Sequence, residues 1–213
     1  MNIVEAMQLT KSYTAGGEII HAIHEVDFKI ETGAFVSFVG PSGSGKSTLL
    51  NMIGCLDKPT SGLLTVDGID VSTLNRQQAA QFRGETIGFI FQDFNLIPVL
   101  TVAENIEYPL LMVQNWPLSE RTKRVKTLLE AVGISDQANK LPSQLSGGQK
   151  QRVAVARALA SNAKLILADE PTANLDHATA YRIIDLMKQM RDEFDTTFIF
   201  STHDPKIMDA AES

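Results

Sequence analysis

The sequence of 213 residues predicts an α/β fold, with an antiparallel β-region at its start and a helical insertion in its middle. Three observations predict this fold. At residues 34–55 a short apolar strand runs into a glycine-rich turn and then into a helical pattern, which is how an α/β unit begins. From about residue 94 to residue 160, helical spacing and prolines replace the strand signals. Alternation of strand and helix returns at residues 164–201.

The residue composition excludes several classes of protein. Hydrophobic residues make up 44% and charged residues 21% of the chain, which is typical of a globular protein. The net charge of -6 has the wrong sign for a protein held mainly on nucleic acid or anionic lipid. Cys55 is the single cysteine, so an intrachain disulfide is excluded and a reducing compartment fits. The apolar runs are far shorter than the roughly 18 residues of a membrane span, so we expect no direct membrane insertion.

The first part of the chain has the alternation of strands. Val26, Phe28 and Ile30 share one face of a predicted strand, and the glycines at 16–17 and 33 bound the region. This spacing favours antiparallel pairing. Asp67-Gly68 is a hairpin signal between two more short strands. The strands predicted in this half are residues 34–39, 63–66, 69–71 and 87–91, and the predicted helix is residues 46–55.

Helical patterns dominate the middle of the chain. Apolar residues from Val125 to Val132 recur at helical spacing, with Ser119 placed to cap the start of this helix and Gly133 its end. A second helix is expected to follow the Ser146-Gly147-Gly148 turn. The final predicted elements are strands at residues 164–168 and 197–201, with a helix between them that carries Ile183, Met187, Met190 and Phe194 on one side.

The glycine-rich turn fits the phosphate-loop pattern G-x-x-x-x-G-K-[ST]. Its glycines let successive N–H groups point at phosphate oxygens, and the helix that follows adds its positive end. Lys46 supplies a charge for the terminal phosphates, and the Ser47 hydroxyl can ligate Mg²⁺. An unrelated glycine-rich turn is the alternative, but a turn between strand and helix favours a phosphate site. The candidate residues are Gly40, Pro41, Ser42, Gly43, Ser44, Gly45, Lys46, Ser47 and Thr48.

A pair of carboxylates follows the apolar strand at residues 165–168. Because ligands bind at the carboxyl edge of an α/β sheet, Asp169 is expected near the phosphate loop, where it would be the Mg²⁺ partner. Glu170 is then within reach of a water that attacks the γ-phosphate, and it could orient that water or accept its proton. The alternative is a strand followed by an ordinary acidic helix start.

A second glycine-rich helix start is formed by Ser146, Gly147, Gly148 and Gln149. Exposed backbone N–H groups and the Ser146 hydroxyl could bind a phosphate, and a plain helix cap is the alternative. One mononucleotide has little room for two such loops from one chain. Two copies related by a two-fold axis could each lend this loop to the other.

These motifs together resemble the ATP-binding subunit of ABC transporters, over residues 9–203. The resemblance implies one ABC ATP-binding domain over residues 1–213, with the P-loop NTPase fold. In that family the core is a mixed or parallel RecA-like sheet with an antiparallel β-subdomain, here about 1–93 and 161–213. The helical signature subdomain corresponds to about 94–160.

The resemblance also assigns roles to single residues. Gln92 matches the glutamine that touches Mg²⁺ or the water, His203 matches the histidine that contacts the γ-phosphate, and Tyr13 matches the aromatic residue that stacks on adenine. The implied catalytic residues are therefore Glu170, His203, Gln92 and Lys46. The implied metal ligands are Ser47, Gln92 and Asp169, with ATP and Mg²⁺ as the bound groups, and residues 146–149 contact the ATP held by the other copy.

Narrower features, at residues 56–62 and 91–98, are similar to the branch of macrolide exporters and lipoprotein-release ATPases. This branch implies a homodimer on ATP binding, integral membrane subunits as partners, and no nucleic acid. It implies a cytoplasmic protein, peripheral on the inner face of the plasma (inner) membrane through those subunits. Ala173 departs from the usual glycine of the branch, and the chain ends at Ser213, where relatives usually continue into a final strand pair.

Three other functions are compatible with part of this pattern. An ABC ATPase of the cell-division type controls a membrane scaffold rather than transport, and the sequence does not separate it from export. A soluble ABC ATPase that acts on nucleic acid or ribosomes is disfavoured by the net charge and by the single cassette. A small-molecule kinase would share the phosphate loop but would not need residues 145–149.

Overall fold

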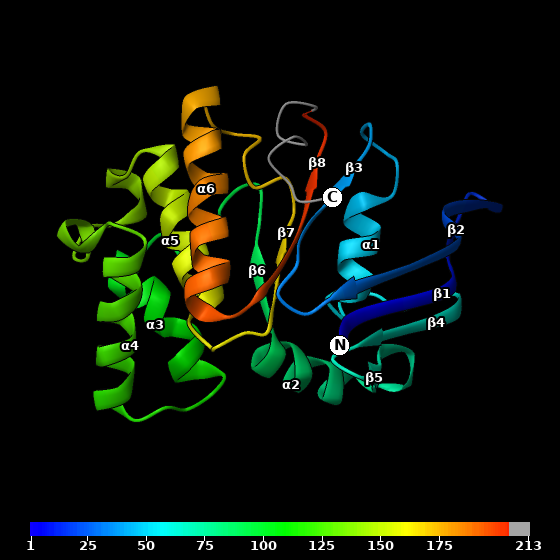
Figure 1. The fold of residues 1–213 in the computed structure, drawn as a ribbon, viewed down its shortest axis with the longest axis horizontal. Coiled ribbons are helices and arrows are strands. Elements are labelled where there is room, and N and C mark those ends of the chain that lie inside the picture. Colours follow the sequence, from blue (N-terminus) through cyan, green and yellow to red (C-terminus); the bar gives the residue numbers. More distant parts are fainter. Residues whose placement is uncertain (205–213) are drawn as a thin grey trace.

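The computed structural model describes residues 1–204 and has two four-stranded sheets (Figure 1). One sheet is antiparallel, in the order β2-β1-β4-β5, and the other is parallel, in the order β3-β8-β7-β6. The predicted α/β class and the antiparallel start are both confirmed. The strands are β1 (Asn2–Ala15), β2 (Glu18–Glu31), β3 (Phe35–Val39), β4 (Ser61–Val66), β5 (Ile69–Asp70), β6 (Ile87–Ile90), β7 (Leu165–Ala168) and β8 (Thr197–Thr202).

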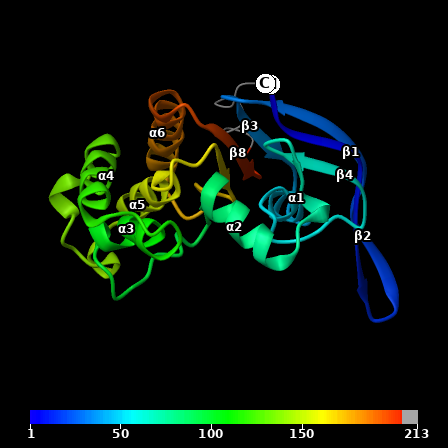
Figure 2. The ribbon, with the colours of Figure 1, turned by 90° about the horizontal axis from the view of Figure 1, so that it is seen from below.

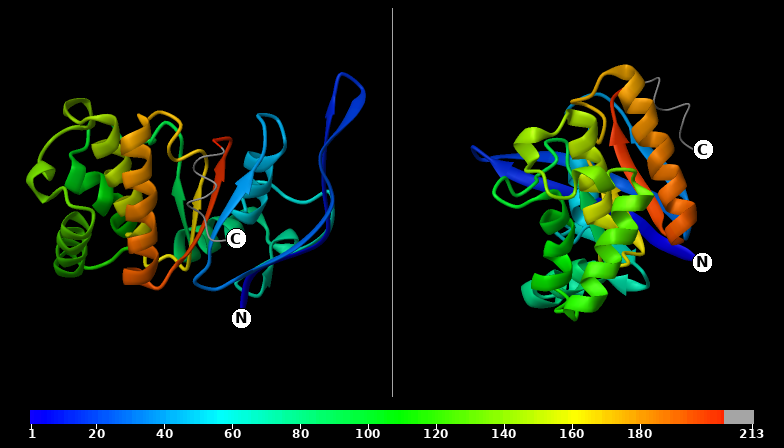
Figure 3. Two further views of the ribbon diagram at one scale, coloured as in Figure 1. Left: turned by 45° about the horizontal axis from the view of Figure 1, so that its top comes forward. Right: turned by 90° about the vertical axis from the view of Figure 1, so that its left-hand side faces the viewer.

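Helices cover both faces of the parallel sheet. Figures 1 and 2 show α3, α4, α5 and α6 on one side of it, with α1 and the antiparallel sheet on the other. The β1–β2 hairpin extends beyond the rest of the molecule (Figure 3). The α-helices are α1 (Lys46–Ile53), α2 (Arg76–Thr86), α3 (Val102–Met112), α4 (Leu118–Ala131), α5 (Gly147–Leu159) and α6 (His177–Phe194), and the 3-10 helices are η1 (Val71–Thr73), η2 (Ser135–Gln137) and η3 (Pro142–Gln144).

Both faces of the parallel sheet are buried, because side chains of one strand point alternately to two cores. In β7, Ile166 and Ala168 pack into the core shared with α3 to α6. Leu165 and Leu167 pack into the core shared with α1 and the antiparallel sheet. This arrangement explains why residues 165–168 are continuously apolar rather than alternating, as expected for a strand covered on both sides.

Parallel pairing brings the carboxyl ends of the core strands to one edge. Val39 lies opposite Thr202, and Ala168 lies opposite both Phe200 and Ile90. The chain leaving β3, β6, β7 and β8 therefore emerges at a common edge, where ligands of open α/β sheets bind. The residues that follow these strands include most of the candidate site.

One predicted helix cap is wrong and the other is confirmed. The residue before α4 is Pro117, so Ser119 lies inside the first turn and does not cap the helix. At the other end Gly133 has φ +69° and its N–H donates to the carbonyl of Glu130. The N–H of Ile134 donates to the Leu129 carbonyl, which completes a Schellman motif.

Two elements between β5 and β6 differ from the prediction. Val71 begins the 3-10 helix η1 rather than ending a strand, because the Asp70 carboxylate caps the turn by accepting from Ser72 N–H. Helix α2 was not predicted, since its mean hydropathy is low. Its sequence signal was the capping box of Asn75 and Gln78, whose side chains bond each other's backbone N–H.

The segment that joins β6 to α3 is anchored by Asn105, whose side chain is fully buried. Its Oδ1 accepts from Ile97 N–H at 2.8 Å. Its Nδ2 donates to the carbonyls of Ile97, Leu100 and Thr101 at 2.9–3.1 Å. One amide group therefore bonds four backbone groups of this segment, of which the Ile97 and Thr101 carbonyls also accept from the N–H groups of Leu100 and Asn105.

Two further expectations concern the end of the chain and membrane-spanning helices. The final strand pair that relatives usually have would follow Ser213, and residues 205–213 themselves lie outside the described residues. Within residues 1–204, no helix combines the length and the apolar character that a membrane crossing requires.

We expect Asn105→Ala to lower the free energy of unfolding by about 2–4 kcal/mol, because the half-buried Ile97 N–H and Leu100 carbonyl lose their side-chain partner and a fully buried side chain is removed. Urea denaturation followed by circular dichroism measures the change. Asn139 is exposed, so Asn139→Ala is the matched control and should change the stability by less than about 0.5 kcal/mol. Equal stabilities of the two variants would contradict the anchoring role.

Candidate functional site

A cavity of about 700 Å³ lies at the carboxyl edge of the parallel sheet. Its volume is in the range of small-molecule binding sites. The glycine-rich loop between β3 and α1 forms one wall, and Ile20, His21 and Ala22 of β2 form another. The predicted site residues that line it are Pro41, Ser42, Gly43, Gly45, Lys46, Ser47, Thr48, Gln92, Glu170 and His203.

The loop conformation requires glycine at position 45. Gly45 precedes the first residue of α1 and has φ +89°, in the left-handed region. A Cβ at this position would lie 2.4 Å from the carbonyl oxygen of Ala22 and 2.8 Å from Ile23 Cδ1. The loop is therefore pressed against β2, and the start of α1 points its N–H groups toward the cavity.

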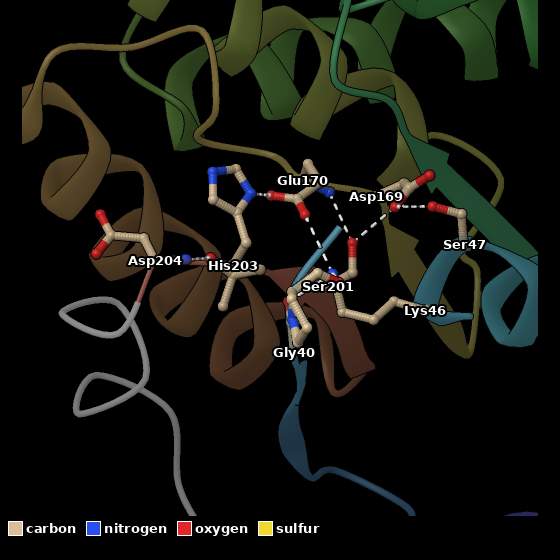
Figure 4. A network of polar contacts seen from close by, with 10 residues as sticks. Gly40, Lys46, Ser47, Asp169, Glu170, Ser201, His203 and Asp204 are labelled. Carbon is tan, nitrogen blue, oxygen red and sulfur yellow. Dashed lines mark hydrogen bonds and ion pairs between the residues drawn. The ribbon is translucent and has the colours of Figure 1, made fainter. Parts of the chain in front are cut away.

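Lys46 extends across the loop toward the end of β7 (Figure 4). Its Nζ donates to the carbonyls of Gly40 at 2.8 Å and Pro41 at 3.1 Å. The same Nζ lies 3.7 Å from Glu170 Oε1, and the Lys46 side chain is only 9% exposed. A single ammonium group thus spans the phosphate loop and the candidate general base.

Ser47 and Asp169 meet although 122 residues separate them in the chain. The Ser47 hydroxyl donates to Asp169 Oδ1 at 3.0 Å. Hydroxyl and carboxylate oxygens are the ligands that Mg²⁺ prefers, and Mg²⁺ usually completes its shell with water and substrate phosphates. The donor set fits such an ion. Within residues 1–204, no group of three or more His, Cys, Asp and Glu is arranged to hold a metal without such additional ligands.

Glu170 lies between two basic side chains. His203 Nδ1 is 2.7 Å from Glu170 Oε2, on the opposite side of the carboxylate from Lys46. Glu170 also has φ +48°, a left-handed conformation that is costly for a residue other than glycine. The backbone turn after β7 thus directs the carboxylate into the cavity, which supports a functional reason for the strain.

The loop after β6 holds Gln92 at the rim of the cavity, where it is exposed. Asn174 connects this loop to the segment before α6. Its Nδ2 donates to the Gln92 carbonyl and to Asp93 Oδ1, each at 3.0 Å. The position of Gln92 is therefore tied to the chain that follows Glu170.

Arg157, near the end of α5, holds the same loop from the other side. Its guanidinium donates to the carbonyls of Phe94, at 2.8 Å, and Asn95. Both of these residues have positive φ, +63° and +47°, so Arg157 secures a tight left-handed turn. Burial lowers the pKa of the Arg157 guanidinium from its usual value, and the two carbonyls offset the loss of water around it.

Tyr13 does not line the cavity, although its cross-strand partner Ile20 does. The Tyr13 hydroxyl donates to Asp57 Oδ2 at 2.7 Å, and the ring is 42% exposed. Lys11 Nζ lies 4.8 Å from the ring centre and 2.6 Å from Asp57 Oδ1. Burial and the bond to Asp57 raise the pKa of Tyr13, so its hydroxyl stays protonated.

Asp57 is the shared partner in this cluster. Burial alone would raise the pKa of Asp57, but hydrogen bonds from Lys11, Tyr13 and the Lys58 N–H hold it below its usual value. In its charged form, the Asp57 carboxylate therefore holds the side chains of Lys11 and Tyr13 in place on β1.

The second glycine-rich loop faces a separate cavity of about 310 Å³. Ser146, Gly147, Gly148 and Gln149 line it, together with Arg152, Asn174 and Arg182, and none of these residues lines the first cavity. Ser146 Oγ accepts from Gln149 N–H at 3.3 Å, so the hydroxyl caps α5 and keeps its proton as a donor. A Cβ at Gly148 would lie 2.7 Å from Thr179 Cγ2, so the loop packs closely on α6.

Three residues that hold candidate site residues or their loops in place were not predicted from the sequence: Ser201, Arg157 and Asp57. Ser201 carried a signal, since a hydroxyl at the end of an apolar core strand has to find a buried partner. Arg157 and Asp57 carried none, because their partners are backbone carbonyls and a tyrosine far away in the chain.

The family model described as ABC transporter matches residues 23–173 of the chain. The chain is 48% identical over 205 residues to the uncharacterized ABC transporter ATP-binding protein MJ0796 of Methanocaldococcus jannaschii, which covers 95% of this chain and 87% of that protein. It is also 43% identical over 211 residues to the macrolide export ATP-binding/permease protein MacB of Aggregatibacter actinomycetemcomitans. That match covers 99% of this chain but only 32% of MacB.

The fold is also similar to solved structures of such cassettes. A dimeric structure of MJ0796 in a post-hydrolysis state, bound to ADP and phosphate, superimposes with a TM-score of 0.87 and 46% identity. The superposition covers 98% of this chain and 91% of the MJ0796 chain. The chain therefore belongs to the ABC transporter family, of which it is an ATP-binding protein.

We expect Asp57→Asn to destabilise the protein at pH 7 by about 1 kcal/mol or less, because the group is partly exposed. The folded pKa of Asp57 lies below the unfolded value of about 3.9, so its contribution is present above that pH and is lost as the pH falls through the folded pKa. The difference between the two proteins should therefore shrink below about pH 4.

Thermal unfolding of both proteins at a series of pH values from neutral to acid measures this dependence. Asp185 is exposed on α6, so Asp185→Asn serves as a charge-matched control that should show no such difference. A gap between wild type and Asp57→Asn that widens toward acid pH would contradict the assignment.

Proposed function

We propose that this chain is the ATP-hydrolysing subunit of an ABC complex, in which two copies close on two ATP·Mg²⁺. Closing and opening of the dimer then move integral membrane subunits that export or extract lipids, lipoproteins or peptides. One observation carries the proposal: the two phosphate-binding loops of one chain line different cavities. A nucleotide held by residues 40–47 gains the loop at residues 146–149 only from a second copy.

The dimeric MJ0796 structure with ADP and phosphate supports this arrangement, because its chain is 46% identical to this one. Within one copy, a single smaller cavity, lined by Glu170, Ala173 and Leu175 among others, borders both the first and the second cavity. It shares Glu170 and His203 with the first cavity and Leu175 with the second. The segment 173–176 therefore joins the two half-sites.

Lys46 and the loop N–H groups would bind the β- and γ-phosphates, with Lys46 exchanging its bonds to Gly40 and Pro41 for phosphate oxygens. Glu170 would orient a water in line with the γ-phosphorus and accept its proton. A bond then forms from the water oxygen to phosphorus, and the bond to the bridging oxygen of ADP breaks. His203 would hold Glu170 and contact the γ-phosphate.

Ser47, Asp169 and Gln92 would hold Mg²⁺, which offsets the charge that develops on the phosphate oxygens. The contact of Ser47 with Asp169 supports the first two of these assignments. Tyr13 would stack on adenine, since its exposed ring pairs across β1 and β2 with Ile20 of the cavity wall. The Ser146 hydroxyl and its neighbouring N–H groups would contact the γ-phosphate held by the other copy.

A membrane subunit would dock beside the loop that follows β6, on the helical subdomain at about residues 94–160. A cavity of about 320 Å³ there is lined mainly by apolar side chains, including Phe89, Phe91, Tyr108, Pro109 and Val113. Tyr108 and Val113 are 42% and 55% exposed. An apolar segment of a permease fits this surface, because MacB combines such a cassette with a permease in one chain. The chain would then be cytoplasmic and peripheral on the inner membrane face.

We expect Glu170→Gln to bind ATP but to stall hydrolysis, because the amide cannot accept the proton of the attacking water. ATP-bound dimer should then accumulate and elute earlier than the monomer in size-exclusion chromatography. Persistence of this variant as a monomer with ATP would count against the shared site.

The companion variant Lys46→Ala removes the charge that would bind the terminal phosphates of ATP. Its turnover should fall by at least about a hundredfold, the scale of losing one strong charge stabiliser, and it should form no ATP-dependent dimer. Turnover at the wild-type rate would remove Lys46 from the mechanism.

We expect the tagged protein, purified from detergent-solubilised membranes of its own cells, to bring an integral membrane subunit with it. Tyr108→Glu should abolish the association because it adds a charge to the apolar surface. Ile69→Glu adds the same charge at an exposed residue of β5 and should leave the association intact. Recovery of no membrane protein under any nucleotide condition would contradict the transport function.

A further inference from the structure

Ser201 is buried at the carboxyl end of β8, beside Asp169 and Glu170, which follow β7 (Figure 4). Its side chain is fully inaccessible to solvent. The hydroxyl donates to Asp169 Oδ1 at 2.7 Å and accepts from the Glu170 backbone N–H at 2.9 Å. One small side chain thus contacts the metal-ligand candidate and the general-base candidate together.

We propose that Ser201 is a positioning residue for ATP hydrolysis, which sets the orientation of the Asp169 carboxylate and the backbone turn that aims Glu170 into the cavity. The inference rests on the proposed function, since it assigns Ser201 to the same site. It adds a residue that the motifs of the sequence do not contain.

The Asp169 carboxylate is held by two serine side chains. Two hydroxyls, those of Ser47 and Ser201, donate to the same oxygen, Oδ1. Oδ2 accepts from neither serine, as Figure 4 shows. A carboxylate held on one oxygen keeps a fixed rotation, and a ligand whose rotation is fixed by a hydrogen bond loses less freedom when it binds an ion.

Ser201 also contacts the backbone of the turn after β7. The last residue of β7 in the ladder is Ala168, and the N–H of Asp169 donates to the Ile90 carbonyl. The next N–H, that of Glu170, points to Ser201 Oγ instead of to a strand carbonyl. Glu170 adopts φ +48° at this step, so Ser201 satisfies the one donor that the left-handed turn removes from the sheet.

Other buried hydroxyls near β8 have a different kind of partner. Thr196 Oγ1 donates to the Ala163 carbonyl at 2.7 Å, and Thr197 Oγ1 accepts from Gly33 N–H at 2.9 Å. These bonds join backbone segments at the opposite end of the strand and serve stability alone. Of the four buried hydroxyl residues at 196–202, Ser201 is the one whose bonds within residues 1–204 reach a carboxylate.

The experiment compares wild type with Ser201→Ala, and it uses Thr196→Val as a control that removes an equally buried hydroxyl outside the site. Steady-state hydrolysis gives kcat and KM. Fluorescence of mant-AMP-PNP, an analogue that is not hydrolysed, gives nucleotide affinity in EDTA and across a Mg²⁺ titration. Thermal unfolding reports the stability of each variant.

We expect Ser201→Ala to lower kcat by about 10- to 100-fold and to raise the Mg²⁺ concentration needed for tight analogue binding. Affinity in EDTA and KM should stay within about twofold of wild type, because the phosphate loop is untouched. Thr196→Val should lower the melting temperature without changing kcat or the Mg²⁺ dependence.

A second pair, Ser201→Thr and Ser201→Val, tests the hydroxyl at constant side-chain size. Both variants add the same bulk, but Ser201→Thr keeps a hydroxyl. Ser201→Thr should therefore have a higher kcat than Ser201→Val and should need less Mg²⁺ for tight analogue binding. Equal impairment of Thr and Val would overturn the proposal, as would a Ser201→Ala variant with wild-type kcat and Mg²⁺ dependence. If wild type binds the analogue but does not hydrolyse ATP, the proposed function fails while the Mg²⁺ titration still decides the role of Ser201.

Discussion

The carboxyl ends of four parallel strands meet at one edge of the core sheet, and every part of the site depends on that meeting. The hydrogen bond from Ser47 to Asp169 depends on it directly, because this bond joins the start of α1 to the residue that follows β7. Because β8 lies between β3 and β7, Ser201 near its end and His203 directly after it approach the same point. Side chains from distant parts of the chain can converge there because both faces of the sheet are packed and its register is fixed.

The side chains of Lys46 and His203 hold the Glu170 carboxylate in the cavity. Its two oxygens contact Lys46 and His203, and its backbone N–H is satisfied by Ser201. A carboxylate held on three sides has a defined direction, which a general base needs before a water can be aligned with it. The left-handed backbone of Glu170 is tolerated because these contacts over-determine it.

Helix α5 connects the second glycine-rich loop with the loop that follows β6. Ser146 caps its first turn in the second cavity, and Arg157 near its other end binds the loop that carries Gln92. Asn174 links the same two regions directly, since it lines the second cavity and donates to the Gln92 carbonyl. Under the proposed function, a helix fixed at both ends would link a displacement of one loop to the other, which coupling of nucleotide closure to a membrane partner requires.

The sequence by itself determined the α/β class, the strand–loop–helix unit around residues 40–47, and the position of Asp169 and Glu170 after a buried strand, because each is encoded in local spacing. It did not determine α2, whose polar composition hides its helix, or the true cap of α4 at Pro117. Only the tertiary structure decided that Ser201, Arg157 and Asp57 support the site. The site residues and loop carbonyls that these three residues contact lie 31 to 63 residues away in the chain, and local sequence carries no record of contacts that form only when the sheet, its loops and α5 have packed together.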